Sequence, residues 1–158
     1  MAIKLRALLP TDREPLEAVV RSDDTFREEE VAVAVELIGD ALTKKDSDYW
    51  FVVAEEEDEA IVGYICYGPT PMTDSSFDLY WIVTHRDARG KGVAGQLIGA
   101  MERDVAAKGA TGIRIETSHL ESYGSARRVY DRHEYQEVAR IPDFYRKGDA
   151  LVTFYKRL

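Results

Sequence analysis

The sequence has a single cysteine, few prolines and glycines, and no long apolar run. Cys66 excludes an internal disulfide, and its place in the apolar run of residues 61–67 predicts a buried small side chain rather than a nucleophile. Five prolines and 11 glycines are too few for a collagenous or low-complexity chain. The longest apolar runs, residues 49–54 and 60–68, are far shorter than the roughly 18–20 residues that cross a bilayer. A globular protein without a membrane span is therefore expected.

Basic side chains are also in the minority. The chain has 21 lysines and arginines against 29 aspartates and glutamates, a formal net charge of −8. This balance argues against non-specific nucleic-acid binding, because neutralising phosphates requires a basic surface. The cations in residues 1–6 are not followed by a continuous apolar segment, so no secretory signal is expected. We therefore expect a cytoplasmic protein with no nucleic-acid partner and no membrane association.

The length of 158 residues is that of one ordinary domain, and no repeat or linker divides residues 1–158. A Thr11-x-x-Glu14 capping box predicts the start of a first helix. Apolar spacing predicts further helices at residues 27–43, 92–108 and 125–133, and strands at residues 3–9, 49–54, 60–67, 77–84, 112–117, 136–141 and 150–158. The predicted order is thus one strand, two helices, three strands, one helix, one strand, one helix and two strands.

The strand predicted at residues 77–84 alternates in character. Strict alternation would place Phe77, Leu79, Trp81 and Val83 on one face of the sheet and Asp78, Tyr80, Ile82 and Thr84 on the other. This strand is expected near the middle of the sheet.

A cluster of glycines and cations lies between that strand and the helix predicted at residues 92–108. Gly90, Gly92 and Gly95 are interspersed with Arg89 and Lys91. Glycines let a ligand approach the backbone closely, and the free N–H groups and dipole of a helix start attract a phosphate. The cluster therefore predicts an anion site, the alternative being a tight turn without a ligand.

The same glycines also match a dinucleotide fingerprint, Gly90-x-Gly92-x-x-Gly95. Glu116 lies near the distance expected for an acid that binds the ribose. However, several strands linked by hairpin-type turns precede the motif, and only 42 residues follow Glu116. That is too few for the remaining βαβ units, so a dinucleotide-binding protein is the weaker hypothesis.

Read as Arg89-x-x-Gly92-x-Ala94 after a strand that ends at residues 81–84, this segment resembles the acetyl-coenzyme A signature of the GNAT superfamily of N-acetyltransferases. The order of the predicted elements is similar to that of the family over essentially the whole chain. The resemblance implies an α/β fold with a mixed, mainly antiparallel central sheet flanked by helices. It also implies acetyl transfer from acetyl-coenzyme A to a primary amine, without a metal.

Residues 126–135 look like the second cofactor-contacting segment of the family. Two residues depart from the family pattern: Glu134 stands at a usual glycine, and Tyr123 stands where many members have an asparagine. Ser122 or Ser125 could replace that asparagine.

The resemblance assigns roles to positions. The implied cofactor contacts are Ile82, Val83, Thr84, Arg89, Gly90, Lys91, Gly92, Val93, Ala94 and Ser125. Tyr130 stands where the family has a tyrosine that approaches the thiol, and a phenol with a reference pKa of about 10 can donate to a thiolate of parent pKa about 8.5. Its alternative role is that of a core tyrosine.

The base that deprotonates the amine has two candidates. Asp78 lies where histone-type members of the family place a carboxylate, and Glu116 lies on the neighbouring strand. Either residue is equally expected to be a solvated or salt-bridged side chain, and an acceptor that arrives neutral needs no base. His85, His119 and His133 show no metal-ligand spacing with one another or with Cys66, so no metal site is expected.

Together these patterns predict an acetyl-coenzyme A-dependent N-acetyltransferase that works by direct transfer in a ternary complex. The acceptor is expected to be a small-molecule or peptide amine, and residues 142–149 either line its groove or form an ordinary loop. A homodimer is compatible with the resemblance. The main alternative is a noncatalytic acyl-coenzyme A-binding or regulatory module.

Overall fold

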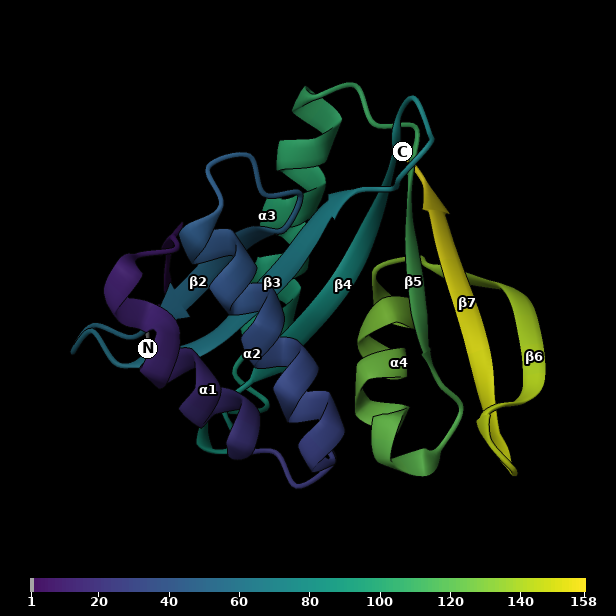
Figure 1. Ribbon diagram of the computed structural model, residues 1–158, viewed down its shortest axis with the longest axis horizontal. Coiled ribbons are helices and arrows are strands. Elements are labelled where there is room, and N and C mark those ends of the chain that lie inside the picture. The colour runs from purple at the N-terminus through teal and green to yellow at the C-terminus, as the bar shows by residue number, and fades with distance from the viewer. Residues whose placement is uncertain (1) are drawn as a thin grey trace.

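Seven strands form one mixed sheet in the order β1-β2-β3-β4-β5-β7-β6 (Figure 1). The computed structural model describes residues 2–158. The strands are β1 Lys4–Ala7, β2 Trp50–Glu55, β3 Ile61–Pro69, β4 Ser76–Thr84, β5 Gly112–Ser118, β6 Gln136–Arg146 and β7 Asp149–Arg157. The helices are α1 Arg13–Arg21, α2 Glu28–Thr43, α3 Val93–Ala107 and α4 Gly124–Arg132, with 3-10 turns η1 Pro10–Asp12, η2 Arg86–Ala88 and η3 Glu121–Tyr123. Only β4 and β5 pair in parallel.

The topology confirms the predicted mixed, mainly antiparallel sheet flanked by helices. It also shows that the dinucleotide alternative is wrong, because a doubly wound dinucleotide domain needs a mostly parallel sheet. Among the helices of residues 2–158, none is both long and apolar enough to cross a membrane.

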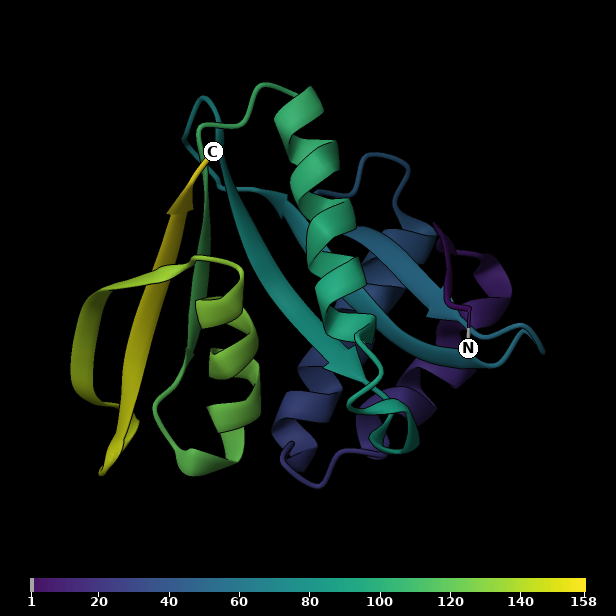
Figure 2. The same ribbon diagram turned by 180° about the vertical axis from the view of Figure 1, so that it is seen from behind.

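Two hydrophobic cores lie on opposite faces of the sheet. Helices α1 and α2 cover one face, whereas α3 and α4 cover the other (Figures 1 and 2). The helix predicted at residues 92–108 from its apolar spacing is confirmed as α3, and the apolar residues that carry this spacing, Val93, Leu97, Ile98, Met101 and Val105, form a stripe that is buried throughout. Each such aliphatic side chain stabilises the fold by roughly 1.5–3 kcal/mol when fully buried.

Cys66 is fully buried in the core under α1 and α2. Burial raises the pKa of its thiol, because an apolar interior disfavours the thiolate. The prediction of a small buried side chain is confirmed.

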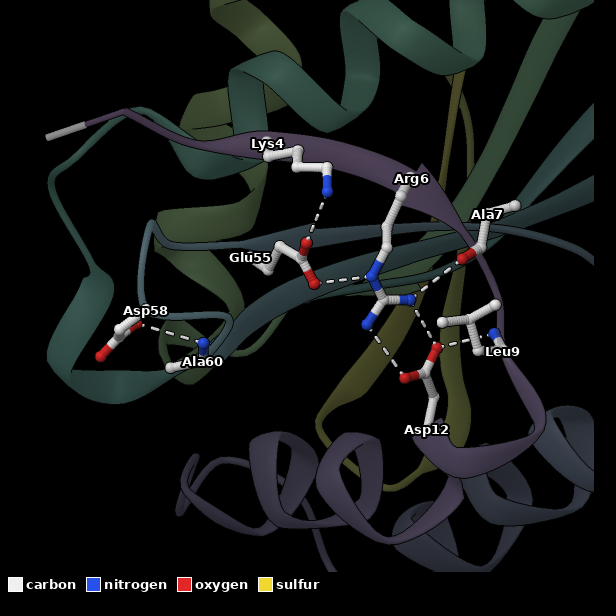
Figure 3. Close-up of polar contacts among 8 residues, drawn as sticks. All are labelled: Lys4, Arg6, Ala7, Leu9, Asp12, Glu55, Asp58 and Ala60. Carbon is white, nitrogen blue, oxygen red and sulfur yellow. Dashed lines mark hydrogen bonds and ion pairs between the residues drawn. The ribbon is translucent and has the colours of Figure 1, made fainter.

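The entry to α1 differs from its prediction, because the capping box at Thr11 is wrong (Figure 3). The carboxylate of Asp12 instead accepts the Leu9 N–H at 2.7 Å and both Nη groups of Arg6 at 2.7 and 3.0 Å. The Arg6 Nε also donates to Glu55 at 2.6 Å. Charge-assisted bonds of this kind are stronger than a hydroxyl cap, and they tie β1, β2 and the start of α1 together.

A bulge in β4 reverses the predicted alternation of side chains between the two faces of the sheet from Trp81 onward. Cys66 pairs with Trp81 and Tyr67 pairs with Leu79, so Tyr80 is an additional residue in β4. Leu79 therefore packs in the α3 core together with Ile82, whereas Trp81 packs in the opposite core with Val83. The predicted grouping of Leu79 with Trp81 is wrong, because one inserted residue moves every later side chain to the other face.

Strands β4 and β5 pair only over their first halves, Ser76 to Leu79 with Gly112 to Ile115. Beyond this point the two strands separate, and α4 lies beside the opening (Figure 2). Residues 81–84 of β4 therefore have a strand partner on the β3 side and none on the β5 side within the described chain. The opening in the sheet leaves backbone groups of a central strand accessible to a ligand.

Candidate active site

A cleft of about 610 Å³ lies where β4 and β5 separate. Its walls come from the end of β4, the turn at residues 89–95 and helix α4, which are segments far apart in the chain. The lining includes the predicted contacts Ile82, Val83, Thr84, Arg89, Gly90, Gly92, Val93, Ala94 and Ser125. Lys91 is outside this lining and lies 3.7 Å from Glu56. The fold thus brings most of the predicted cofactor contacts to one cleft.

The glycine turn has the geometry of an anion cradle. Gly90 and Gly92 both have φ of +79°, which a residue with a Cβ adopts only at a cost of roughly 1–2 kcal/mol. No atom lies within 4 Å of the position that a Cβ would take on either glycine, so the space in front of the turn is open. The N–H groups of residues 93–95 lie in the first turn of α3, where a helix offers no acceptor of its own. These groups can therefore receive a phosphate.

Positive side chains surround this cradle from two sides. Arg89 pairs with Asp23 at 2.7 Å, which partly offsets its charge. Arg128 and Arg132 of α4 also line the cleft; they lie within the predicted cofactor-contacting segment at residues 126–135, although neither was predicted individually. Together with Ser125 they recur at the i, i+3 and i+7 positions of one helix face, which is the signal that could have identified them.

Tyr130 lies between the cleft and a second cavity and lines both. Its side chain is buried, and its ring is 5.7 Å from that of Phe154 and 6.3 Å from that of Tyr135, measured between centroids. Burial raises the pKa of its phenol, because removal from water disfavours the phenolate. The hydroxyl therefore stays protonated at neutral pH.

The end of α4 holds Tyr130 in place through its backbone. The N–H of Tyr135 donates to the carbonyl of Tyr130 at 3.0 Å, and the N–H of Glu134 donates to that of Asp131 at 3.1 Å. This is a Schellman motif, in which the residue after the cap takes a left-handed conformation. Glu134 does so with φ of +67°, so the turn forms although the usual glycine is absent.

The second cavity has a volume of about 440 Å³ and lies on the other side of Tyr130. It shares five lining residues with the cleft: Phe26, Ile82, Tyr123, Ala126 and Tyr130. Two cavities that meet at one set of side chains can hold two molecules in contact.

The two candidate bases occupy different surroundings. Glu116 lines the second cavity, its side chain is 42% exposed, and its carboxylate lies 3.4 Å from Arg114. Asp78 lines neither cavity, its side chain is only 8% exposed, and Arg114 donates to both of its oxygens at 2.7 and 3.2 Å. The structure therefore brings Glu116, and not Asp78, to the same cavity as Tyr130.

Other walls of the second cavity were predicted only in part. Tyr145, Arg146 and Asp149 line it, and they belong to the segment at residues 142–149 that was expected either to line a groove or to form a loop. Most of that segment continues strand β6 as far as Arg146. Phe26 and Glu30, near the start of α2, were missed because no local spacing connects them with β4 or β5.

Tyr123 joins two walls of the site. Its phenol donates a hydrogen bond to the carboxylate of Glu30 on α2. Ser122 and Ser125 on either side of it both line the cleft. No group of three or more His, Cys, Asp or Glu residues within residues 2–158 is placed to hold a metal ion.

The family-model and structure comparisons with known proteins both point to one family of acetyltransferases. A family model of the acetyltransferase (GNAT) domain matches residues 46–137. A crystal structure of a protein assigned to the GNAT family, from Desulfovibrio desulfuricans, is 35% identical, covers 99% of each chain and superposes with a TM-score of 0.91. A search of curated proteins found no match.

More distant structures share the fold. An aminoglycoside 6'-N-acetyltransferase complexed with coenzyme A is 15% identical, with 99% of this chain and 97% of that chain covered and a TM-score of 0.75. The corresponding enzyme from Enterococcus faecium is 18% identical, with the same coverage and a TM-score of 0.76.

Proposed function

The chain belongs to the GNAT family of acetyltransferases, and from this premise we propose that it transfers an acetyl group directly to a primary amine in a ternary complex. Membership of the family makes the protein an acyltransferase that uses acetyl-coenzyme A. One observation carries the proposal of direct transfer: the cleft beside the glycine turn and the second cavity meet at Tyr130. Cosubstrate and acceptor can then react without an enzyme nucleophile, and Cys66 is buried outside both cavities.

The cleft fits coenzyme A in shape and charge. The open space in front of Gly90 and Gly92 accommodates a pyrophosphate, which the N–H groups of residues 93–95 bind. Arg128 and Arg132 supply further positive charge from α4. Ser122 or Ser125 offers the side-chain oxygen for which many family members use an asparagine.

The unpaired part of β4 binds the arm that carries the thioester. Because residues 80–84 lack a strand partner on the β5 side, an extended chain can pair there as an added strand. The backbone N–H near Val83 then donates to the thioester carbonyl and stabilises the oxyanion that develops on it.

Tyr130 is the general acid of this proposal. The protonated phenol donates a hydrogen bond to the sulfur as the carbon–sulfur bond breaks, which stabilises the departing thiolate. Its placement between the two cavities supports this role over that of a core tyrosine alone.

Glu116 is the general base. A primary aliphatic amine has a pKa near that of lysine, about 10.4, so it arrives mainly as an ammonium and must lose a proton before it attacks. The exposed carboxylate of Glu116 in the second cavity accepts that proton directly or through water. Asp78 and Arg114, which are register partners on β4 and β5, instead hold the two strands together just before they separate.

Calorimetric titration with acetyl-coenzyme A, coenzyme A and NAD, at low and moderate salt, tests the cofactor assignment. We expect acetyl-coenzyme A to bind and salt to weaken the binding, because the cradle recognises phosphates by charge. NAD shares the pyrophosphate but has no extended arm to pair with β4, so it is expected to bind more weakly than coenzyme A. Release of coenzyme A in the presence of primary amines tests turnover. Binding without release for any amine would favour a noncatalytic acyl-coenzyme A-binding module, and absence of binding would overturn the proposal.

Two properties of the protein in the cell complete the proposal. Its place is the cytoplasm, which the free and buried thiol of Cys66 supports, because disulfides are rare in that compartment. Its assembly is a homodimer, which the exposed side chains of Val138 and Ile141 on edge strand β6 favour. Measurement of its mass in solution tests the latter.

A further inference from the structure

The second cavity carries more aromatic surface than acetyl transfer itself requires. Its aromatic lining, apart from Tyr130, comprises Phe26, Tyr49, Tyr80, Trp81, Tyr123 and Tyr145. These residues come from the segments just before α2 and β2, from β4, from η3 and from the end of β6, so the fold gathers them from five parts of the chain. The rings of Phe26 and Trp81 are in contact, with centroids 4.9 Å apart. Such a wall favours an apolar, flat guest.

The charged groups of the cavity are few and mostly paired. Glu30 accepts the phenol of Tyr123, and Asp149 pairs with Arg146 at 2.6 Å. Glu116 is the most exposed of the three carboxylates, and its ion-pair partner Arg114 lies 3.4 Å away. The lining therefore offers Glu116, in the cavity that Tyr130 also lines, as the most accessible negative charge for one ammonium group.

The excess of carboxylates also disfavours an acceptor with a carboxylate of its own. Three acidic residues face the cavity against one guanidinium, which Asp149 already engages. A second ammonium on the acceptor would have to compete for Glu30 or Asp149, which Tyr123 and Arg146 already engage. A volume of about 440 Å³ is in the lower half of the range of small-molecule sites, roughly 300–1,000 Å³.

We propose that the acceptor is a small amine with one cationic group on an aromatic body, that is, an arylalkylamine rather than a polyamine or an amino acid. This inference rests on the proposed function, because it takes the second cavity as the acceptor site. The ammonium lies beside Glu116 and Tyr130, and the ring lies against the aromatic wall.

Four amines test the inference by differing in ring and charge. With acetyl-coenzyme A and the whole protein, 2-phenylethylamine is compared with n-butylamine, which lacks the ring, and with phenylalanine, which adds a carboxylate. Spermidine lacks the ring and adds cations, so its one-feature comparison is with n-butylamine. Release of coenzyme A is measured at equal concentrations of neutral amine. We expect kcat/KM for 2-phenylethylamine to exceed each of the others by about tenfold or more, because it alone matches both ring and charge.

Variants at Tyr145 connect the preference to the aromatic wall. Tyr145→Ala is expected to raise the KM for 2-phenylethylamine by about tenfold and to leave that for n-butylamine within about twofold. Tyr145→Phe keeps the ring and is expected to keep the original KM. Phe144→Ala removes the neighbouring exposed ring on β6, which is outside the cavity lining, and it serves as the positional control.

The outcomes separate this inference from the proposed function. If acetyl-coenzyme A binds but spermidine, phenylalanine or n-butylamine is the better acceptor, or none of the four amines reacts, the inference is overturned. If Tyr145→Ala changes the KM of both amines equally, the aromatic wall does not select the acceptor. If acetyl-coenzyme A does not bind, the proposed function fails, and the inference falls with it.

Discussion

Glu134 adopts a backbone conformation that favours glycine, which makes Glu134→Gly a stabilising substitution. Its φ of +67° places a side chain in the left-handed region, at a cost of roughly 1–2 kcal/mol for an L-residue. Glycine removes this cost but loses about 0.4–1 kcal/mol more through the conformational freedom of the unfolded chain. The side chain of Glu134 is exposed, so little packing is lost. We expect a net gain in the free energy of unfolding of about 0.5–1 kcal/mol.

The end of α3 provides a matched control. Gly109 follows that helix at the equivalent position, with φ of +81°, and the N–H of Ala110 donates to the carbonyl of Val105 at 3.0 Å. No atom lies within 4 Å of the position of a Cβ on Gly109, so Gly109→Ala changes only the backbone preference. It is expected to lower the free energy of unfolding by about 1 kcal/mol.

Urea unfolding followed by circular dichroism measures both effects, and a thermal scan should show a rise of about 1–4 °C for Glu134→Gly. The affinity for acetyl-coenzyme A should not change, because the hydrogen bonds that hold Tyr130 are made by the backbone. If Gly109→Ala destabilises as expected while Glu134→Gly gives no gain, the argument from the left-handed conformation of Glu134 is refuted.

The remaining predictions concern catalysis, the cradle and acid stability. Tyr130→Phe should lower kcat by about 100-fold without changing the affinity for acetyl-coenzyme A, and an unchanged kcat across pH would remove Tyr130 as the acid. Glu116→Gln should depress the low-pH limb of the pH–rate profile, whereas an unaltered limb would point to water or to a neutral acceptor. Gly92→Ala, at φ of +79°, should lower the free energy of unfolding by about 1 kcal/mol and weaken the binding of acetyl-coenzyme A; unfolding and calorimetry measure the two effects, and unweakened binding would contradict the cradle. Hydrogen bonding to Arg6 lowers the pKa of Glu55 below 4.5, so its stabilisation is present above about pH 4.5 and is lost as the pH falls through the lowered pKa. Glu55→Gln should therefore be less stable than the parent at neutral pH but lose less stability on acidification. Urea unfolding at several pH values checks this, and an equal fall in the free energy of unfolding of both proteins at acid pH would contradict it.

The parts of the fold that depend on residues close to one another in the sequence could be predicted from the sequence. The apolar stripe of α3 follows from a three- and four-residue spacing, and all of its predicted members are buried. The glycine turn at residues 89–95 was located by residue type alone, because only glycine adopts positive φ without strain. These features need no knowledge of the rest of the molecule.

Other features could not be predicted, because distant segments create them. Tyr80 is an additional residue in β4 only relative to the register of its partner strand β3. This bulge reversed the predicted faces of Trp81 and Ile82. Thr11 had the spacing of a helix N-cap. The start of α1 is instead held by the carboxylate of Asp12, which accepts hydrogen bonds from Arg6 on β1.

The same limit applies to the site. The sequence determined the chemical types that are proposed for acetyl transfer, namely backbone N–H groups after a glycine turn, a phenol and a carboxylate. Only the tertiary structure decided between Asp78 and Glu116 as the residue that reaches the second cavity, because Arg114 on β5 engages the former and the opening between β4 and β5 exposes the latter. Side-chain surroundings depend on packing between segments that are far apart in the sequence, and no local spacing encodes that packing.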